Sequence, residues 1–373
     1  MTEVFETQAI VSRDTLQNGG WKFEDIRVRQ PKEGELLVKM VATGICHSDV
    51  FAGSVPKGAS PLAVYPRVLG HEGAGYVVAV GPGVTIASVN DPVLLSFASC
   101  QSCFHCKSGV PATCKDFLAW NTLSFDKVFT SSDLPDNAEP DITGTYFSQS
   151  SFAGLSIVKQ SSIVNARDLV KNNSELQLFA PLGCGAQTGA GSVTKVAEAG
   201  PKDSVTVIGL GGVGMGALMA AKLRECHTII AIDRVPSRLA LARELGATHT
   251  IDTTGIPPGE ALIKAIREAT EGLGTSVTIE TTGVPALTES GYEATRARGK
   301  HIQIGNLFAN KSFIGAVEGW ADPREFIPEM IQWYREGKFP LEKMVKFLPA
   351  KDFQKGLDEM HSGATIKPVI LWD

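Results

Sequence analysis

Residues 204–214 read Ser-Val-Thr-Val-Ile-Gly-Leu-Gly-Gly-Val-Gly, an apolar run that ends in a glycine-rich turn. The run predicts a strand that is buried on both faces, as strands of a parallel sheet are. Residues 211–226 then predict a helix, and residues 228–233 predict the next buried strand. Because strands and helices keep alternating, the sequence predicts a doubly wound parallel-sheet domain of the α/β class, a Rossmann fold, over residues 187–321.

The glycine-rich turn matches the G-x-G-x-x-G pattern of dinucleotide sites. Gly209 allows a tight turn, Gly211 lets the backbone approach a pyrophosphate, and Gly214 allows the helix to pack closely on the strand. The helix begins near Gly212 and offers N–H groups to the phosphates. A plain helix-capping turn has the same glycines. Here, however, the turn joins a strand to a helix, and Asp233 follows about 20 residues later at the end of the next strand. We therefore expect a bound dinucleotide.

The same acidic residue indicates which dinucleotide is bound. A carboxylate at Asp233 accepts hydrogen bonds from a ribose diol and repels a 2′-phosphate, so we expect NAD. Arg234 is able to receive that phosphate, which leaves NADP possible. Arg238, one turn further on, either binds the same ribose or is an exposed helix residue.

The first 186 residues have a different pattern. Valine-rich alternating runs at 35–45, 73–83 and 91–97 lie between Gly and Pro residues, which predicts a β-rich domain. The stretch 107–150 is polar and irregular, and we expect loops there. From about residue 322 the chain again has helical patterns, at 323–338 and 351–364.

Composition limits the possible partners. The chain has 373 residues, 43% hydrophobic and 20% charged, which is typical of a soluble protein with two domains. A net charge of −5 without a basic run argues against nucleic acid and anionic membrane as partners. We find no apolar run of about 18 residues that would span a membrane and no secretory signal. Seven cysteines then favour metal binding in a reducing, cytoplasmic compartment.

Four of these cysteines lie within fifteen residues, in the order Cys100-x-x-Cys103-x-x-Cys106-x7-Cys114. Zinc prefers four thiolates in a tetrahedral array, and a short lobe is able to wrap it. An iron–sulfur cluster accepts the same ligands and is the alternative. Four thiolates leave no open coordination position, so the expected role is to hold the lobe together.

A second candidate metal site is assembled from residues far apart in the sequence. Cys46 lies in GICHSD, His71 in GHEGAG and Cys184 in PLGCG. Two cysteines and one histidine with an open fourth position form the ligand set of catalytic zinc in alcohol dehydrogenase. The spacing alone indicates nothing, because an isolated cysteine is usually a small buried hydrophobic residue.

The motifs together, in this order, resemble the zinc-containing medium-chain alcohol dehydrogenase family, from about residue 33 to residue 371. The resemblance implies a GroES-like catalytic domain of residues 1–186 plus 322–373, beside the Rossmann domain of residues 187–321. FSQSSFA (147–153), LLSFASC (94–100) and MHSGATIKPVI (360–370) are similar to the aryl- or benzyl-alcohol dehydrogenase branch. The segments that carry the wider likeness are GICHSD (44–49), GHEGAG (70–75), the four-cysteine lobe, PLGCGAQTG (181–189) and GLGGVG (209–214).

The resemblance implies two zinc ions in each chain and a role for each matching residue near the catalytic one. Cys46, His71 and Cys184 would bind the catalytic zinc, a Lewis acid that lowers the pKa of the alcohol. Ser48 would take the alcohol proton, and Asp49 would fix the tautomer of His71. Glu72 would lie beside the zinc, where the alternative is a buried carboxylate with an ordinary partner.

The resemblance also implies residues that hold the dinucleotide. His47 and Lys367 match positions that usually face the pyrophosphate. Val213 and Thr188 would pack against the nicotinamide and select its reactive face. Phe51 departs from the family, since many relatives have a histidine there that passes the proton to solvent. The proton relay must then end elsewhere, at the ribose hydroxyl or at His47.

We expect the enzyme to transfer hydride between a primary aryl or allylic alcohol and NAD, with the reverse aldehyde reduction equally open. Ser96, Phe97, Phe51 and residues 117–120 are candidates for an apolar substrate pocket. The alternatives are an NADP-dependent aldehyde reductase of specialised metabolism and a non-catalytic NAD(H)-binding regulator. We expect a homodimer, although the segment 305–315 is about a dozen residues shorter than in relatives that pair strands across the dimer interface.

Overall fold

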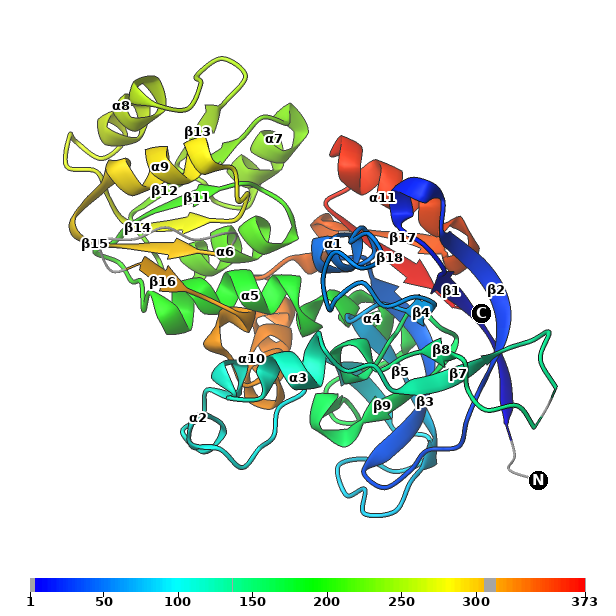
Figure 1. Ribbon diagram of the computed structural model, residues 1–373. Coiled ribbons are helices and arrows are strands. Elements are labelled where there is room, and N and C mark those ends of the chain that lie inside the picture. The colour runs from blue at the N-terminus through cyan, green and yellow to red at the C-terminus, as the bar shows by residue number, and fades with distance from the viewer. Residues whose placement is uncertain (1–3, 136, 305–312, 373) are drawn as a thin grey trace. The chain divides into compact units, whose positions relative to one another are not determined.

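The computed structural model describes residues 4–135, 137–304 and 313–372. The chain divides into two compact units (Figure 1). The first unit consists of Met1–Cys184, Asp322–Ile331 and Val345–Asp373, and the second consists of Gly185–Ala321 and Gln332–Met344. No helix among the described residues is both long and apolar enough to cross a membrane.

The first unit is built from a closed barrel and a seven-stranded sheet. Apolar side chains from both make one core, which includes Leu37, Val38 and Phe152. The barrel strands, in order, are β1 (Phe5–Ser12), β2 (Trp21–Val28), β7 (Lys127–Ser131), β8 (Ile142–Thr143) and β4 (Arg67–Val68). The sheet strands are β10 (Ile163–Asn165), β6 (Pro92–Leu95), β5 (Gly73–Val80), β3 (Glu35–Gly44), β18 (Lys367–Leu371) and β17 (Val345–Pro349), with β9 (Leu155–Lys159) also paired to β3.

Strand register in this sheet brings three distant segments together. In the antiparallel pairing of β3 with β5, Thr43 lies opposite Gly73. In the pairing of β3 with β18, Gly44 lies opposite Val369. The end of β3 therefore lies beside the start of β5 and the start of β18. The helices of this unit are short, apart from the last: α1 (His47–Ala52), α2 (Phe104–Lys107), α3 (Phe117–Asn121), α4 (Asn173–Leu178) and α11 (Phe353–Ser362). Residues of α10 (Pro323–Arg335) belong to both units.

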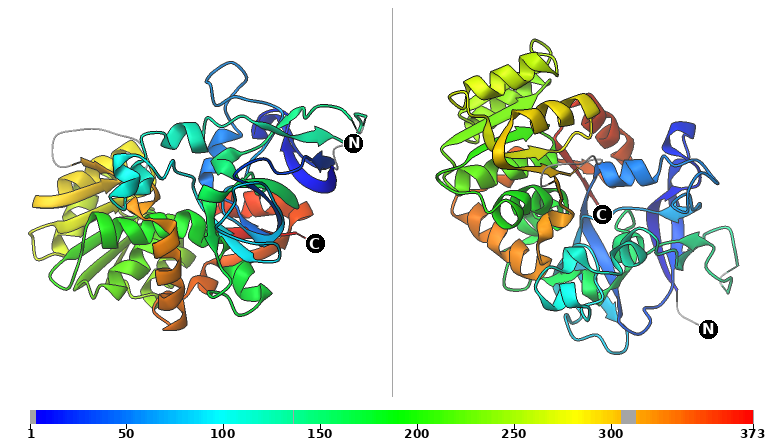
Figure 2. Two further views of the ribbon diagram at one scale, coloured as in Figure 1. Left: turned by 90° about the horizontal axis from the view of Figure 1, so that it is seen from below. Right: turned by 60° about the vertical axis from the view of Figure 1, so that its left-hand side comes forward.

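The second unit contains a parallel sheet whose strand order reverses between β11 and β14. Helices α8 and α9 lie on one face of the sheet and α5 and α6 on the other (Figure 1), and the right-hand view of Figure 2 shows the same layers. The strand order is β13 (His249–Asp252), β12 (Thr228–Asp233), β11 (Ser204–Ile208), β14 (Thr275–Glu280), β15 (Thr295–Gln303) and β16 (Phe313–Gly315). The helices are α5 (Gly185–Gly191), α6 (Gly212–Leu223), α7 (Pro236–Glu244), α8 (Glu260–Glu268) and α9 (Pro285–Ala294).

The doubly wound fold predicted from residues 204–214 is confirmed, because β11, the turn, α6 and β12 follow one another as expected. The prediction of irregular loops over 107–150 is partly wrong. Lys127–Ser131 forms β7, which completes its backbone hydrogen bonds by pairing with β2 at the register Ile26–Ser131. This pairing joins segments about a hundred residues apart, so local sequence does not reveal it. Of the short segment 305–315, residues 305–312 lie outside the described residues.

Candidate active site and metal centres

Strand register, described above, brings Cys46 close to His71 and Glu72, and Cys184 joins them from a turn outside the sheet. Cys46 follows β3 and precedes α1, His71 and Glu72 precede β5, and Cys184 follows a short 3₁₀ turn at Ala180–Gly183. All four side chains are buried, and one ligand atom from each lies within 4.8 Å of every other. The structure therefore brings together the three residues that sequence comparison assigned to catalytic zinc, with Glu72 beside them.

The imidazole of His71 is arranged as a metal ligand would be. Its Nδ1 lies 2.8 Å from the Asp49 carboxylate, and both side chains are 0% exposed. Its Nε2 is buried and has no hydrogen-bond partner among the described residues. A buried ring nitrogen without a partner is costly unless a ligand occupies it. Since zinc binds imidazole nitrogen and thiolate, the donor set suits this ion.

Asp49 holds more than the histidine. One carboxylate oxygen accepts from the backbone N–H of Cys46 at 3.0 Å, and the other accepts from Gly70 at 3.1 Å as well as contacting His71. The carboxylate thus ties the two ligand segments to each other. This is the contact predicted for a residue that fixes the histidine tautomer.

The surroundings of Cys46 favour the thiolate form of its side chain. A hydrogen bond with Cys184 holds the pKa of Cys46 well below its ordinary value, and the nearby charges of Lys367 and His71 act in the same direction against the effect of burial. A thiolate, not a thiol, is the metal ligand.

Lys367, predicted to face a pyrophosphate, pairs here with Glu72. Its Nζ lies 2.9 and 3.0 Å from the two carboxylate oxygens and 3.3 Å from the carbonyl oxygen of Ile45. Both charged side chains are almost fully buried. Burial raises the pKa of Glu72, and the ammonium of Lys367 opposes this effect. The pyrophosphate role of Lys367 remains a prediction.

Two residues that sequence reasoning did not single out support His71. The Gln149 side chain donates to the backbone carbonyls of His71 and Ser96, each at 2.9 Å. The ring of Phe147 stacks on the imidazole with centroids 4.5 Å apart. Phe147 and Ser148 adopt left-handed backbone angles, with φ of 51° and 56°, which few non-glycine residues do. The FSQSSFA segment that contains them was the signal available in the sequence.

The proposed proton-transfer residues lie on α1. The hydroxyl of Ser48 is 3.9 Å from the Cys46 sulfur, and its backbone carbonyl accepts from the Tyr146 hydroxyl at 3.2 Å. His47 and Ser48 are exposed within this chain, and Phe51 is 67% exposed. Phe51 has no group that carries a proton, as its identity already implied.

The second candidate centre is the cysteine lobe. The sulfurs of Cys100, Cys103, Cys106 and Cys114 all lie within 4.8 Å of one another, and all seven cysteines of the chain are free thiols. Zinc–sulfur bonds of about 2.3 Å in a tetrahedron place sulfurs about 3.8 Å apart, and the Cys100–Cys106 distance is 3.9 Å. Hydrogen bonds from Ser102 lower the pKa of Cys100 to about 6. The lobe therefore fits a four-thiolate metal site.

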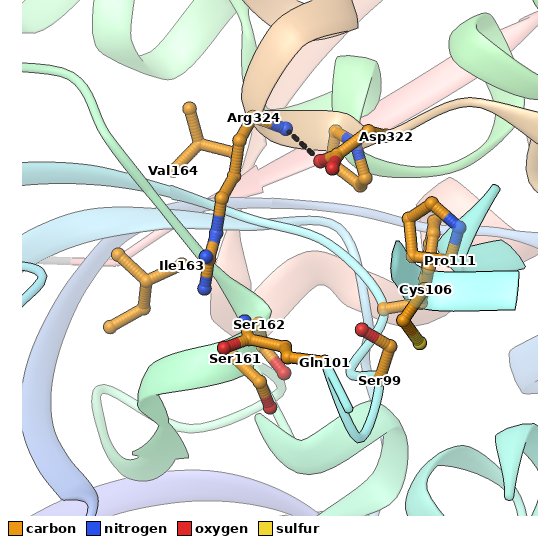
Figure 3. A pocket seen from close by; sticks show the side chains of 12 residues that line it. Ser99, Gln101, Cys106, Pro111, Ser161, Ser162, Ile163, Val164, Asp322 and Arg324 are labelled. Carbon is orange, nitrogen blue, oxygen red and sulfur yellow. Dashed lines mark hydrogen bonds between the residues drawn. The ribbon is translucent and has the colours of Figure 1, made fainter. Parts of the chain in front are cut away.

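A cavity of about 200 Å³ adjoins this lobe (Figure 3). Of the substrate-pocket candidates, Phe97 lines it, whereas Ser96 is buried and donates to the Gly183 carbonyl at 2.6 Å. With its amide oxygen turned toward Arg324, Gln101 accepts from both terminal guanidinium nitrogens at 2.5 and 3.0 Å. None of the four residues of the first centre lines the cavity, so it is separate from that centre. The lining residues are Phe97, Ser99, Gln101, Cys106, Pro111, Ser161, Ser162, Ile163, Val164, Asp322, Pro323 and Arg324.

The glycine-rich turn of the second unit has the geometry its sequence predicts. Gly209 has a φ of 88°, which favours glycine. A Cβ on Gly214 would lie 1.8 Å from the Gly209 carbonyl oxygen, whereas a Cβ on Gly211 would meet nothing within 4 Å. Gly212 is the first residue of α6. The turn is therefore closed on the helix side and open at Gly211, where a pyrophosphate is expected to approach.

Asp233 ends β12 directly beside this turn. One carboxylate oxygen accepts from the Leu210 N–H at 2.7 Å, and the other accepts from the N–H groups of Arg234 and Val235. Arg238 lies 3.8 Å from the carboxylate. The arrangement holds a negative charge at the C-terminal edge of the sheet, near the switch point where dinucleotides bind.

The predicted nicotinamide contacts, Thr188 on α5 and Val213 on α6, belong to neighbouring helices. A Cβ on Gly189 would lie 1.9 Å from the Val213 carbonyl oxygen, so the two helices touch through their backbones. Sequence reasoning missed Glu318, a 5% exposed residue whose carboxylate accepts from Gln187 at 2.7 Å and lies 3.5 Å from the Thr188 hydroxyl.

Comparison with known proteins gives consistent results. Residues 32–168 match the alcohol dehydrogenase GroES-like domain, and residues 212–319 match the zinc-binding dehydrogenase domain. The geraniol dehydrogenase of Castellaniella defragrans is 33% identical over 99% of both chains. A crystal structure of an alcohol dehydrogenase zinc-binding domain protein from Burkholderia ambifaria covers 100% of both chains, with a TM-score of 0.88 and 35% identity. That of benzyl alcohol dehydrogenase from Acinetobacter calcoaceticus covers 99% of this chain and 100% of its own, with a TM-score of 0.84 and 34% identity.

The chain therefore belongs to the zinc-containing medium-chain alcohol dehydrogenase family, and the resemblance seen in its motifs is confirmed. It is an oxidoreductase with a GroES-like and a zinc-binding dehydrogenase domain. Small alcohols and aldehydes suit this family as substrates.

Proposed function

We propose that this protein oxidises primary aryl or allylic alcohols with NAD, reduces the corresponding aldehydes with NADH, and depends on zinc for both reactions. The observation that carries the proposal is the buried group of Cys46, His71 and Cys184, in which the His71 Nε2 has no partner among the described side chains. These three residues would hold the catalytic zinc. The four cysteines between Cys100 and Cys114 would hold a structural one.

Zinc bound there supplies a Lewis acid that lowers the pKa of an alcohol hydroxyl and polarises a carbonyl. The residues around it have separate tasks. Asp49 keeps the proton of His71 on Nδ1, which leaves Nε2 as the metal ligand. Glu72, neutralised by Lys367, adds little net charge beside the cluster.

Ser48 is the proposed acceptor of the alcohol proton, because its hydroxyl lies 3.9 Å from the sulfur of Cys46. From Ser48 the proton must leave without help from Phe51. His47, the neighbouring exposed residue on α1, and the ribose hydroxyl of the cofactor are the two proposed exits. A His47→Gln variant distinguishes them, since loss of the imidazole slows turnover only if His47 is the exit.

NAD is the proposed cofactor because the Asp233 carboxylate stands where a 2′-phosphate would be repelled. Gly209, Gly211, Gly212 and Gly214 would cradle its pyrophosphate. Arg238 would contact the ribose, and Val213 and Thr188 the nicotinamide. Arg234, exposed beside Asp233, is the observation that favours NADP as the second candidate.

The aryl or allylic substrate is supported by the relatives named geraniol dehydrogenase and benzyl alcohol dehydrogenase. The rings of Tyr146 and Phe147, both almost fully buried, pack against His71 and make the surroundings of the centre aromatic, as suits such substrates. We also propose a cytoplasmic location, supported by seven free cysteines, and a homodimer, which size-exclusion chromatography with light scattering would test.

A spectrophotometric screen tests the function. Benzyl, cinnamyl and short aliphatic alcohols are each assayed with NAD and with NADP, and Cys46→Ser serves as the metal-site control. We expect the highest kcat/KM with benzyl or cinnamyl alcohol and NAD, and no turnover above background in the control. Equal turnover by Cys46→Ser and the parent protein would refute the zinc-dependent mechanism.

A further inference from the structure

The turn Glu318–Trp320 lies at the edge of the sheet where a dinucleotide is expected. Strands β11, β14, β15 and β16 are parallel, so their C-terminal ends share one edge. The glycine-rich turn follows β11 at this edge, and the turn Glu318–Trp320 comes three residues after the end of β16. Glu318 therefore belongs to the same edge as Gly209–Gly214, where ligands of such sheets bind.

The turn is fixed against α5. A Cβ on Gly319 would lie 2.7 Å from the Cα of Gly191 and 2.5 Å from the carbonyl oxygen of Gln187. Glu318, Gly319 and Trp320 have consecutive left-handed φ angles of 50°, 62° and 55°. Two of these three residues are not glycine, so the backbone carries strain that the packing must offset. Such strain concentrates at functional sites, and here it places one acidic side chain.

That side chain is a carboxylate held by donors. The Gln187 amide donates to Glu318 Oε2 at 2.7 Å, and the Thr188 hydroxyl lies 3.5 Å from the same oxygen. Amide and hydroxyl donors are the partners of an ionised carboxylate, which only accepts. Because Glu318 is 5% exposed, little water screens its charge.

We propose that the Glu318 carboxylate stabilises the oxidised cofactor over the reduced one in the bound state, and so favours aldehyde reduction. The inference rests on the proposed function, which puts the nicotinamide against Thr188 and Val213. The oxidised ring is a pyridinium with one positive charge, whereas the reduced ring is neutral. A buried negative charge one side chain away attracts only the oxidised ring.

The consequence for the reaction follows from its balance. The reduced cofactor transfers a hydride to the carbonyl carbon, the carbonyl oxygen takes a proton, and the products are the alcohol and the oxidised cofactor. A group that stabilises the bound oxidised form shifts the equilibrium between bound species toward this side. Thus Glu318 acts through charge, and it does not need to touch the substrate.

The test compares the affinities of the two cofactor forms. NADH binding is measured by fluorescence titration and NAD⁺ binding by competition with NADH. Glu318→Gln removes the negative charge and keeps the shape of the side chain. Both residues are non-glycine, so the left-handed φ angle at this position costs about the same in the variant. We expect the Kd of NAD⁺ to rise about tenfold while that of NADH stays within about twofold, because only the oxidised ring carries a charge that the carboxylate attracts.

Glu271→Gln is the matched control, since this exposed residue precedes β14 at the opposite edge of the same sheet and should change neither Kd. If Glu318→Gln does not fold, Glu318→Ala also removes the charge, and the ratio of the Kd of NAD⁺ to the Kd of NADH is measured in that variant instead. An unchanged ratio, or equal weakening of both forms as a purely structural role would cause, overturns the inference alone. A wild-type protein that binds neither form overturns the proposed function and this inference with it.

Discussion

Asp49 and His71 form a fully buried pair in which the carboxylate lies 2.8 Å from Nδ1 and leaves Nε2 to face the cysteines. Asp49 is not one of the candidate ligand residues, yet its carboxylate contacts His71 and accepts a hydrogen bond from the backbone N–H of Cys46. The proposed metal site therefore depends on a residue that is not itself a proposed ligand.

Replacement of Asp49 should weaken zinc binding at the first centre without releasing zinc from the cysteine lobe. We expect Asp49→Asn to lower zinc affinity at the first centre, or activity, by about 10- to 100-fold, because the amide does not fix the imidazole tautomer as the carboxylate does. Zinc content after dialysis against a weak chelator measures the effect. Asp358→Asn, an exposed change on α11, is the control and should retain the parent zinc content.

The Lys367–Glu72 pair should show strong coupling in a double-mutant cycle. Lys367→Met removes the ammonium from beside the buried Glu72 carboxylate, which costs about 3–5 kcal/mol of folding free energy. Glu72→Gln combined with Lys367→Met removes both charges and should recover most of this loss. Additive destabilisation in chemical denaturation would mean that the two side chains are not coupled as their 2.9 Å separation implies.

The cysteine lobe should lose its metal independently of the first centre. We expect Cys103→Ser to bind one zinc fewer per chain and to make the lobe sensitive to protease, because three thiolates hold the ion less well than four. Cys226→Ser, a change at a buried cysteine outside both clusters, should keep the parent metal content. Metal analysis and limited proteolysis check both outcomes.

Stability should depend on pH through Glu35. Burial raises the pKa of Glu35, but two bonds from Arg29 and one from the Lys32 N–H outweigh it, so the pKa is lowered. Because the pKa of Glu35 is lower in the folded state than in the unfolded state, the ionised carboxylate stabilises the fold at pH values above the unfolded-state pKa. This stabilisation is lost as the pH falls through the folded-state pKa. Glu35→Gln should therefore lower the midpoint temperature of thermal unfolding at pH 7, and it should lower that temperature less below about pH 4.

The exposed neighbour Glu33 provides the control for this prediction. Glu33→Gln should have little effect on thermal unfolding at either pH. Comparison within each pH is required, because acid also protonates metal ligands in every variant. A Glu35→Gln effect that stays constant across the range would contradict the ion-pair explanation.

Cofactor choice should respond to Asp233. Asp233→Ala removes the charge that repels a 2′-phosphate, so we expect the ratio of kcat/KM for NADPH to that for NADH to rise about tenfold. Asp252→Ala, at the register position opposite Asp233 on the neighbouring strand, is the control. If the NADPH-to-NADH ratio of kcat/KM changes equally in both variants, Asp233 does not determine the choice between the two cofactors. Arg234 would then be the next candidate.

The sequence predicted the second unit well because its signals are local. An apolar run, glycines at fixed offsets and an acidic residue at the end of the next strand are enough to define β11, α6 and Asp233. The cysteine lobe is local in the same way. The group of Cys46, His71 and Cys184 is different, since only family resemblance related these residues before the fold brought them together.

The remaining features depend on long-range contacts. β7 pairs with a strand about a hundred residues away, and the side chain of Gln149 meets the backbone of His71 across the core. Glu318 was missed for the same reason, because its partners Gln187 and Thr188 are about 130 residues distant. A single sequence carries little information about such pairs, whose positions are set by tertiary packing.

Metal content measured together with activity tests the central claim most directly. The account predicts two zinc ions per chain in the active wild-type protein, and one zinc with no turnover above background in Cys46→Ser. A fully active wild-type protein with a single zinc, bound by the cysteines between Cys100 and Cys114, would contradict it.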